Sequence, residues 1–169
     1  MESKIVFNEL ERNISVFKSL LEKIPEEQYR WKPSPDKWNL LEIVCHLHDE
    51  ELEDFRARVK HVLETPSEKM PGINPVELVS LRKYAEQDYE TTLDAFLTDR
   101  KNSVEWLRSL KNPTWNNFYT HAKLGNLYAG MFLNNWLAHD LLHIRQITRL
   151  KFDYFRFKTG ESFDYAGNW

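Results

Sequence analysis

The sequence predicts an all-α protein, a four-helix bundle in which one longer crossover connection joins two of the helices. Apolar residues recur at three- and four-residue steps over long stretches, strand-like alternation is rare, and proline and glycine fall mostly between these stretches. The chain has 169 residues, of which 41% are hydrophobic. This size and composition suit one buried core, so we expect residues 1–169 to form a single domain.

Four helices are predicted by the periodicity. The first spans about 6–24, and the second begins at the N-cap residue Asn39, with Glu42 placed to complete a capping box. Each of these two helices ends before a proline. The third spans about 88–110, and the last runs from about 125 to 155. Apolar residues occupy nearly every side of the last helix, which is typical of a helix buried on most sides.

The segments between the helices carry their own signals. Residues 65–74, with two prolines and a glycine, form the longest connection and are the candidate crossover. Asn74 and Pro75 predict the start of a short helix, because proline is favoured at the first helical position. The tail, 158–169, has no helical period. It either packs its aromatic residues across the bundle or is frayed.

Two histidines lie four residues apart in the last predicted helix, His139 and His143, and so share one face of it. Imidazoles at this spacing can bind one metal ion. The spacing alone is weak evidence, because six histidines in such a chain give an accidental pair about one time in six. Both side chains fall on an inward stripe, so they are either ligands or core histidines with hydrogen-bonded nitrogens.

A second motif lies upstream, where Trp38 is followed eight residues later by His46-Leu and Asp49 lies three residues further on. With the motif His-Asp-x-x-His-x-x-Gln at 139–146 and, less tightly, the segment 121–125, this order and spacing resembles the DinB/YfiT superfamily of metal-binding helical proteins. The resemblance implies a DinB-like four-helix bundle. It also implies that His46 joins His139 and His143 in binding a divalent metal ion.

Periodicity and resemblance disagree on the upstream ligand. Periodicity alone favours His48, which lies on the side of the helix that carries the apolar residues, whereas His46 lies nearly opposite. We prefer His46, because the family spacing from Trp38 falls on it. Its face is also rich in carboxylates, and ligating imidazoles need hydrogen-bond acceptors behind them.

Three further polar residues are candidates for the site. Asp49 and Glu50 stand about one turn beyond His46, so each is a candidate catalytic base or ligand-orienting group; the alternative is that both are ordinary acids of a helix surface. Gln146 lies one turn past His143 and belongs to the matched motif. It is therefore a candidate for hydrogen bonding within the site and binding a cofactor.

The ligand set suggests the chemistry. Three neutral imidazoles leave the charge of a divalent ion uncompensated and one coordination position open, as in catalytic zinc sites. Imidazole suits zinc, nickel, copper and iron, and of these we expect zinc or nickel. The resemblance implies transfer of a low-molecular-weight thiol, such as bacillithiol, mycothiol or glutathione, onto an electrophile. One alternative is a hydrolase that uses metal-bound hydroxide, with Glu50 or Asp49 as base. Another is a non-enzymatic metal-binding or dimerising bundle of a stress response.

Charge and composition bear on partners and location. The net charge is −3, and acidic and basic residues are interleaved, so we expect no nucleic acid and no membrane as partner, but a small-molecule substrate. No secretory or membrane-spanning apolar run is evident, and the single Cys45 cannot form an internal disulfide, so a cytoplasmic location is expected. The 23 aromatic residues exceed the needs of one bundle core, and proteins that this chain resembles often pair through helix faces. We therefore expect a homodimer.

Overall fold

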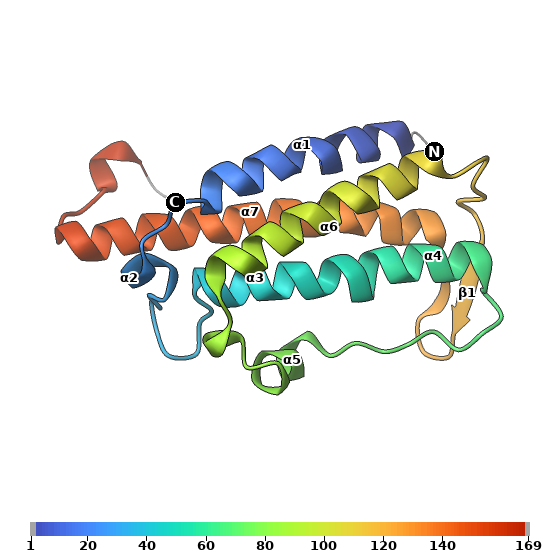
Figure 1. The fold of residues 1–169 in the computed structure, drawn as a ribbon, viewed down its shortest axis with the longest axis horizontal. Helices are drawn as coiled ribbons and strands as arrows, with labels where there is room; N and C mark the ends of the chain where they lie inside the picture. The colour runs from blue at the N-terminus through green and yellow to red at the C-terminus, as the bar shows by residue number, and fades with distance from the viewer. Residues whose placement is uncertain (1–2, 168–169) are drawn as a thin grey trace.

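Four long helices pack side by side in the computed structural model, which describes residues 3–167 (Figure 1). The second of them is continuous, but its hydrogen-bonding pattern changes midway in a π-helical segment, η1. In chain order the long helices are α1 (Ser3–Leu21), α3 with η1 and α4 (Leu40–Asp49, Glu50–Arg56 and Ala57–Glu64), α6 (Tyr89–Ser109) and α7 (Ala129–Thr159). The predicted all-α bundle is confirmed.

The directions of the helices differ from a simple up-down-up-down order. In Figure 1, α3–α4 and α6 run the same way, while α1 and α7 run the opposite way. The short helix α2 (Glu26–Tyr29) lies in the turn between α1 and α3. Two consecutive parallel helices need a connection that returns along the bundle. The segment from Thr65 to Asp88 makes this crossover, and it carries α5 (Pro75–Leu81) and η2 (Tyr84–Glu86).

Local sequence signals set the starts of the helices. Asn39 accepts a hydrogen bond from the backbone N–H of Glu42, and the Glu42 carboxylate accepts one from the N–H of Asn39, each at 2.9 Å. This is the predicted capping box, and such a cap contributes about 1 kcal/mol. Asp88 caps α6 by accepting from the Thr91 amide, and Pro75 opens α5.

A β-hairpin precedes the last helix. The helix was predicted to begin at about 125, and this start was wrong, because residues 125–128 form the second strand of the hairpin. Strands β1 (Phe118–His121) and β2 (Gly125–Tyr128) pair antiparallel, and α7 begins at Ala129. Gly125 has a φ of 74°, a left-handed conformation that suits a turn and not a helix. Strands of four residues are too short to give a clear alternation, which is why periodicity did not predict them.

The C-terminal end of α7 also differs from its predicted place near Phe155. The helix continues to Thr159 and ends where Gly160 adopts a φ of 69°. The tail then packs Phe163 against Phe152, with ring centroids 5.2 Å apart, before the short helix η3 (Asp164–Ala166). The tail was predicted either to pack its aromatic residues or to fray, and Phe163 shows the packing. Residues 168 and 169 lie outside the described residues.

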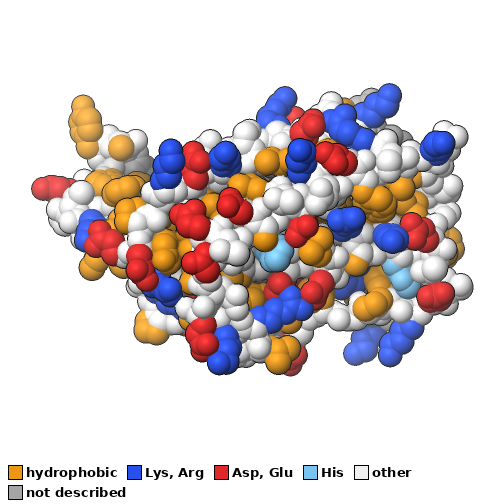
Figure 2. All heavy atoms as spheres, in the orientation of Figure 1, with side chains coloured by type: hydrophobic (Ala, Val, Ile, Leu, Met, Phe, Trp, Pro, Cys, Tyr) orange, Lys and Arg blue, Asp and Glu red, His pale blue; other side chains and the backbone are white. Residues whose placement is uncertain are grey.

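The surface carries charges of both signs. Lysine and arginine side chains alternate with aspartate and glutamate over the face seen in Figure 2. This mixing matches the interleaved charges of the sequence. Among residues 3–167, none of the helices combines the length and the apolar character needed to cross a membrane.

A buried ionic network lies between the two apolar clusters that fill the bundle, and it is centred on Arg100 of α6. The guanidinium donates to both carboxylate oxygens of Asp140 on α7, at 2.5 and 2.8 Å, and to Glu51 of η1, at 2.8 Å. Asn13 of α1 donates to Asp140, and the indole of Trp136 donates to Glu51. One network therefore joins all four long helices.

The charges of this network depend on one another. Burial by itself would lower the pKa of Arg100, but Asp140 and Glu51 reverse the effect, so the pKa is raised. Burial raises the pKa of Glu51, and Arg100 acts against that rise. Loss of one partner would leave the others buried and unpaired, which is the costly way to disrupt a buried ion pair.

We predict that Arg100→Met lowers the free energy of unfolding by about 3–5 kcal/mol, because it leaves two buried carboxylates without their cation. Arg108→Met is the matched control. Arg108 lies on the same helix and pairs with Glu11 at 2.7 Å, but both side chains are exposed, so its loss should cost less than about 1 kcal/mol. Urea unfolding of both variants is the measurement, and equal losses would contradict the role assigned to Arg100.

Candidate metal centre

Three imidazole rings meet between α3 and α7. The Nε2 atom of His139 lies 3.2 Å from that of His46 and 3.0 Å from that of His143. One ring nitrogen from each residue lies within 4.8 Å of the other two. The structure thus brings together, from two distant parts of the chain, the three histidines singled out in the sequence.

The start of α3 positions His46. The capping box at Asn39 fixes where the helix begins, and His46 lies two turns further along. Trp38, just before the cap, packs its ring against that of His46, with centroids 4.9 Å apart. The tryptophan is partly buried and covers one side of the imidazole. His46 is consequently only 6% exposed.

The rotation of α7 about its axis positions the other two rings. His139 and His143 occupy successive turns, and their ring centroids are 4.3 Å apart. Asp140, between them in sequence, is bound by Arg100 and Asn13 from neighbouring helices. Because Asp140 is held toward α6 and α1, the two histidines are held toward α3.

Burial keeps the three rings uncharged. It lowers the pKa of His46 to about 3 and that of His139 to about 2, with repulsion from neighbouring histidines adding to the effect. Burial also lowers the pKa of His143, and the side chain of Gln146 acts in the opposite direction. Neutral imidazole is the form that binds a metal ion.

The arrangement of these neutral rings fits a divalent metal ion. A neutral imidazole has one donor and one acceptor nitrogen, so three Nε2 atoms that face one another cannot all be paired by hydrogen bonds among themselves. Two nitrogens that each lie about 2.1 Å from one ion at the tetrahedral angle are roughly 3.4 Å apart. The observed separations of 3.0 and 3.2 Å come near this value.

Glu50 is the acidic candidate that faces the cluster. Its Oε1 atom lies 4.0 Å from Nδ1 of His46, and the side chain is buried. Within residues 3–167, neither of these two atoms has a hydrogen-bond partner. Burial raises the pKa of Glu50 to about 7. A carboxylate that hydrogen-bonds the second nitrogen of a ligating imidazole sets its tautomer and orientation. Glu50 stands beside this nitrogen of His46, at a separation longer than a hydrogen bond.

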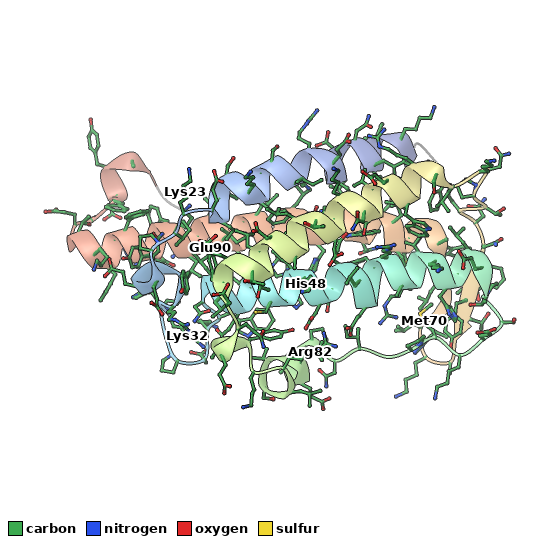
Figure 3. All side chains as sticks on the ribbon, in the orientation of Figure 1. Lys23, Lys32, His48, Met70, Arg82 and Glu90 are labelled. Carbon is green, nitrogen blue, oxygen red and sulfur yellow. The ribbon has the colours of Figure 1, made fainter. Side chains whose placement is uncertain are left out.

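Asp49, the other acidic candidate, belongs to a different part of the molecule. Its carboxylate accepts hydrogen bonds from Tyr84 and Arg82, each at 2.5 Å. It lines a pocket of about 470 Å³ with His48 and Cys45, and none of the three clustered histidines borders that pocket. In Figure 3, His48 lies along α3 with Arg82 below it. The structure therefore does not bring Asp49 to the histidine cluster.

His48 and Cys45, which line the same pocket, have structural roles. His48 Nε2 lies 3.0 Å from Oδ2 of Asp99 on α6, so it pairs away from the cluster. Cys45 is buried, and burial raises the pKa of its thiol to about 12. A thiol in that state is a small packed side chain and not a nucleophile.

The π-helical segment changes the phase of the apolar residues along the second long helix, but it is not what made periodicity favour His48. A π-helix bonds residue i to i+5 and so adds a residue to the turn. Each added residue rotates the downstream part of the helix by about 100° relative to an uninterrupted α-helix. The apolar residues beyond η1, such as Val59 and Val62, therefore do not share the phase of α3. Within α3 itself almost every position is buried, His46 included, so the apolar side of a helical wheel does not show which imidazole faces α7.

Gln146 lies at the mouth of the site. It is exposed, and with His143, Arg145 and Arg149 it lines a surface hollow of about 420 Å³. It is thus close to one clustered histidine and open to solvent, the position that a residue contacting an incoming molecule would need.

The residues that hold the cluster in place were not predicted from the sequence. Arg100, Glu51 and Asn13 are buried polar side chains, and none was singled out. A signal was present for the arginine, because it falls in the inward series of α6 between Phe96 and Val104. A cation at an inward position predicts a buried anionic partner.

The parallel middle helices and the three histidines define an all-helical bundle with a candidate metal centre inside it. The family model described as the DinB superfamily matches residues 9–147, and the chain belongs to this superfamily. No curated protein matches the sequence.

Among solved structures, the chain is similar to YfiT from Bacillus subtilis, described as a probable metal-dependent hydrolase with an unusual four-helix bundle topology. The TM-score is 0.78 at 18% sequence identity, and the match covers 95% of this chain and 89% of that one. At this identity the likeness is one of fold.

We predict that the protein, purified without chelators or a His tag and reconstituted with zinc or nickel, holds close to one metal ion per chain. His46→Ala should reduce occupancy sharply, because it removes one of three converging nitrogens. His48→Ala, two residues away but paired with Asp99, should leave occupancy intact. Elemental analysis is the measurement. The reverse order of the two variants would show that the upstream ligand is His48.

Proposed function

We propose that this protein is a metal-dependent enzyme that transfers a low-molecular-weight thiol onto an electrophile at the site formed by His46, His139 and His143. The observation that carries the proposal is that the cluster is both neutral and accessible. His139 borders one surface pocket and His143 borders another, so small molecules can approach the cluster from outside. Three neutral ligands with an accessible side are typical of catalytic rather than structural metal sites.

The residues of the chain have separate parts in this proposal. The three histidines would hold the metal ion, which would supply a positive charge that stabilises a thiolate. Glu50 would orient His46 if its carboxylate closed the 4.0 Å gap to Nδ1, and Trp38 packs against the ring of His46. Gln146, exposed beside His143, is placed to hydrogen-bond the polar part of the thiol.

The overall reaction replaces one bond at an electrophilic carbon by a carbon–sulfur bond and moves the proton of the thiol. The thiol sulfur bonds to an electrophilic carbon; with an epoxide, the C–O bond breaks and the proton of the thiol ends on the new hydroxyl group. With a chloro-aromatic compound, chloride leaves together with that proton. Both reactions need only the thiol and the electrophile as reactants.

A second candidate function is metal-dependent hydrolysis. The buried Glu50 beside the cluster supports it, because a carboxylate there could accept a proton from water. The fold likeness to a protein described as a probable metal-dependent hydrolase supports it as well. Asp49 is the weaker base, since Tyr84 and Arg82 occupy its carboxylate. A metal-binding bundle without turnover is the third candidate.

We expect the cobalt-substituted protein, titrated with glutathione or bacillithiol, to develop a saturable sulfur-to-metal charge-transfer band that His143→Ala abolishes. Protein, thiol and metal together should then consume a chloro-nitroaromatic compound or an epoxide faster than any two of them. The absence of a band at millimolar thiol would contradict thiol transfer. Ester or amide hydrolysis without thiol would favour the hydrolase, and inactivity on a broad panel would favour the binding bundle.

We also propose that the protein is a homodimer of the cytoplasm. Exposed aromatic side chains near the C-terminal end of α7 support pairing, since Phe155 is 48% and Phe157 is 65% exposed. Light scattering at micromolar concentration should give twice the chain mass, and Phe157→Glu should reduce it. A monomer mass for the unmodified protein would contradict the dimer.

A further inference from the structure

A pocket of about 660 Å³ lies beside His139 and differs from the rest of the site in its lining. Its volume is that of a typical small-molecule site. Side chains from η1, α4, α7 and the β-hairpin surround it, and most of them are apolar: Phe55, Leu124, Leu127, Met131, Phe132, Ala138 and Leu142. The pocket therefore offers apolar contact directly next to one of the clustered imidazoles.

The charged groups of this pocket satisfy each other. Arg58 forms an ion pair with Asp54, one turn earlier on the same helix. Its guanidinium also donates to the sulfur of Met70 on the crossover, at 3.1 Å, and lies over the ring of Phe132; Figure 3 labels Met70 near the hairpin. Because the two charges cancel, the lining offers no net charge to attract an ionic ligand.

The pocket has a deep apolar side and an open rim. Phe55 and Phe132 are each 8% exposed, whereas Leu124 and Leu142 are 69% and 54% exposed. Large exposed leucines around a concave apolar surface are typical of a site that a ligand covers. A molecule lying between them would place one end next to His139.

We propose that this pocket takes the apolar body of the electrophile, and that the substrate class is a neutral, elongated and mainly apolar small molecule. The inference rests on the proposed function in taking His139 as part of the reacting centre. The reactive end of the substrate lies toward the histidines, and its hydrocarbon part lies against Phe132, Leu127 and Leu124. The hairpin thereby selects the substrate without taking part in the reaction.

The test is direct binding of an unreactive homologous series, the 2-alkanones from 2-pentanone to 2-nonanone, followed by calorimetry or protein NMR shifts. Each added methylene should lower the dissociation constant about three- to fourfold until the pocket is filled. Leu124→Glu and Leu142→Glu should flatten this dependence. Leu141→Glu is the matched control, since Leu141 is equally exposed on α7 but does not line the pocket; it should leave the dependence unchanged.

The outcomes separate this inference from the proposed function, because the binding series needs no thiol. The apolar substrate class would be overturned if affinity did not depend on the number of methylenes in the ketone. It would also be overturned if Leu124→Glu and Leu142→Glu both kept that dependence. A clear dependence in a protein that gives no cobalt–thiolate band would support the apolar pocket and overturn thiol transfer. The metal content of each variant is measured alongside. If it equals that of the unmodified protein, a change in ketone affinity comes from the pocket and not from loss of the metal ion.

Discussion

The guanidinium of Arg100 is the interaction on which the arrangement of the bundle depends. It binds carboxylates from η1 and α7, and through Asp140 it reaches Asn13 of α1, so every long helix contributes to one buried network. Each carboxylate partner is a direct sequence neighbour of a residue in the candidate site, with Glu51 next to Glu50 and Asp140 next to His139. A buried ion pair is weak evidence for stability, but it tolerates little change in geometry. It therefore fixes the rotation of η1 and α7 together.

Much of the fold could be predicted because its signals are local. The capping box at Asn39, the proline that opens α5 and the aspartate that caps α6 act through neighbouring residues, so they can be recognised in the sequence. The pair His139 and His143 is local in the same sense. Its grouping with His46 needed the family spacing, since 93 residues separate His46 from His139.

The features that could not be predicted arise from long-range packing or from small departures from ideal periodicity. The π-helical segment leaves no obvious mark in the sequence, yet it changes the phase of the apolar residues in the second half of a helix. The hairpin is too short for an alternating pattern. The residues that Arg100 joins lie on three other segments, and only the folded chain shows that they meet. In each case tertiary structure decides between local patterns of similar strength.

The β-hairpin has a consequence for how such a protein can diversify. It lies between α6 and α7 in the chain and contributes Leu124 and Leu127 to the wall of the pocket beside His139, while the three clustered imidazoles come from α3 and α7. The imidazoles and this part of the wall are thus encoded by separate segments. During evolution, substitutions in the hairpin can therefore change which compounds the pocket accepts, while the bundle and its three imidazoles stay the same.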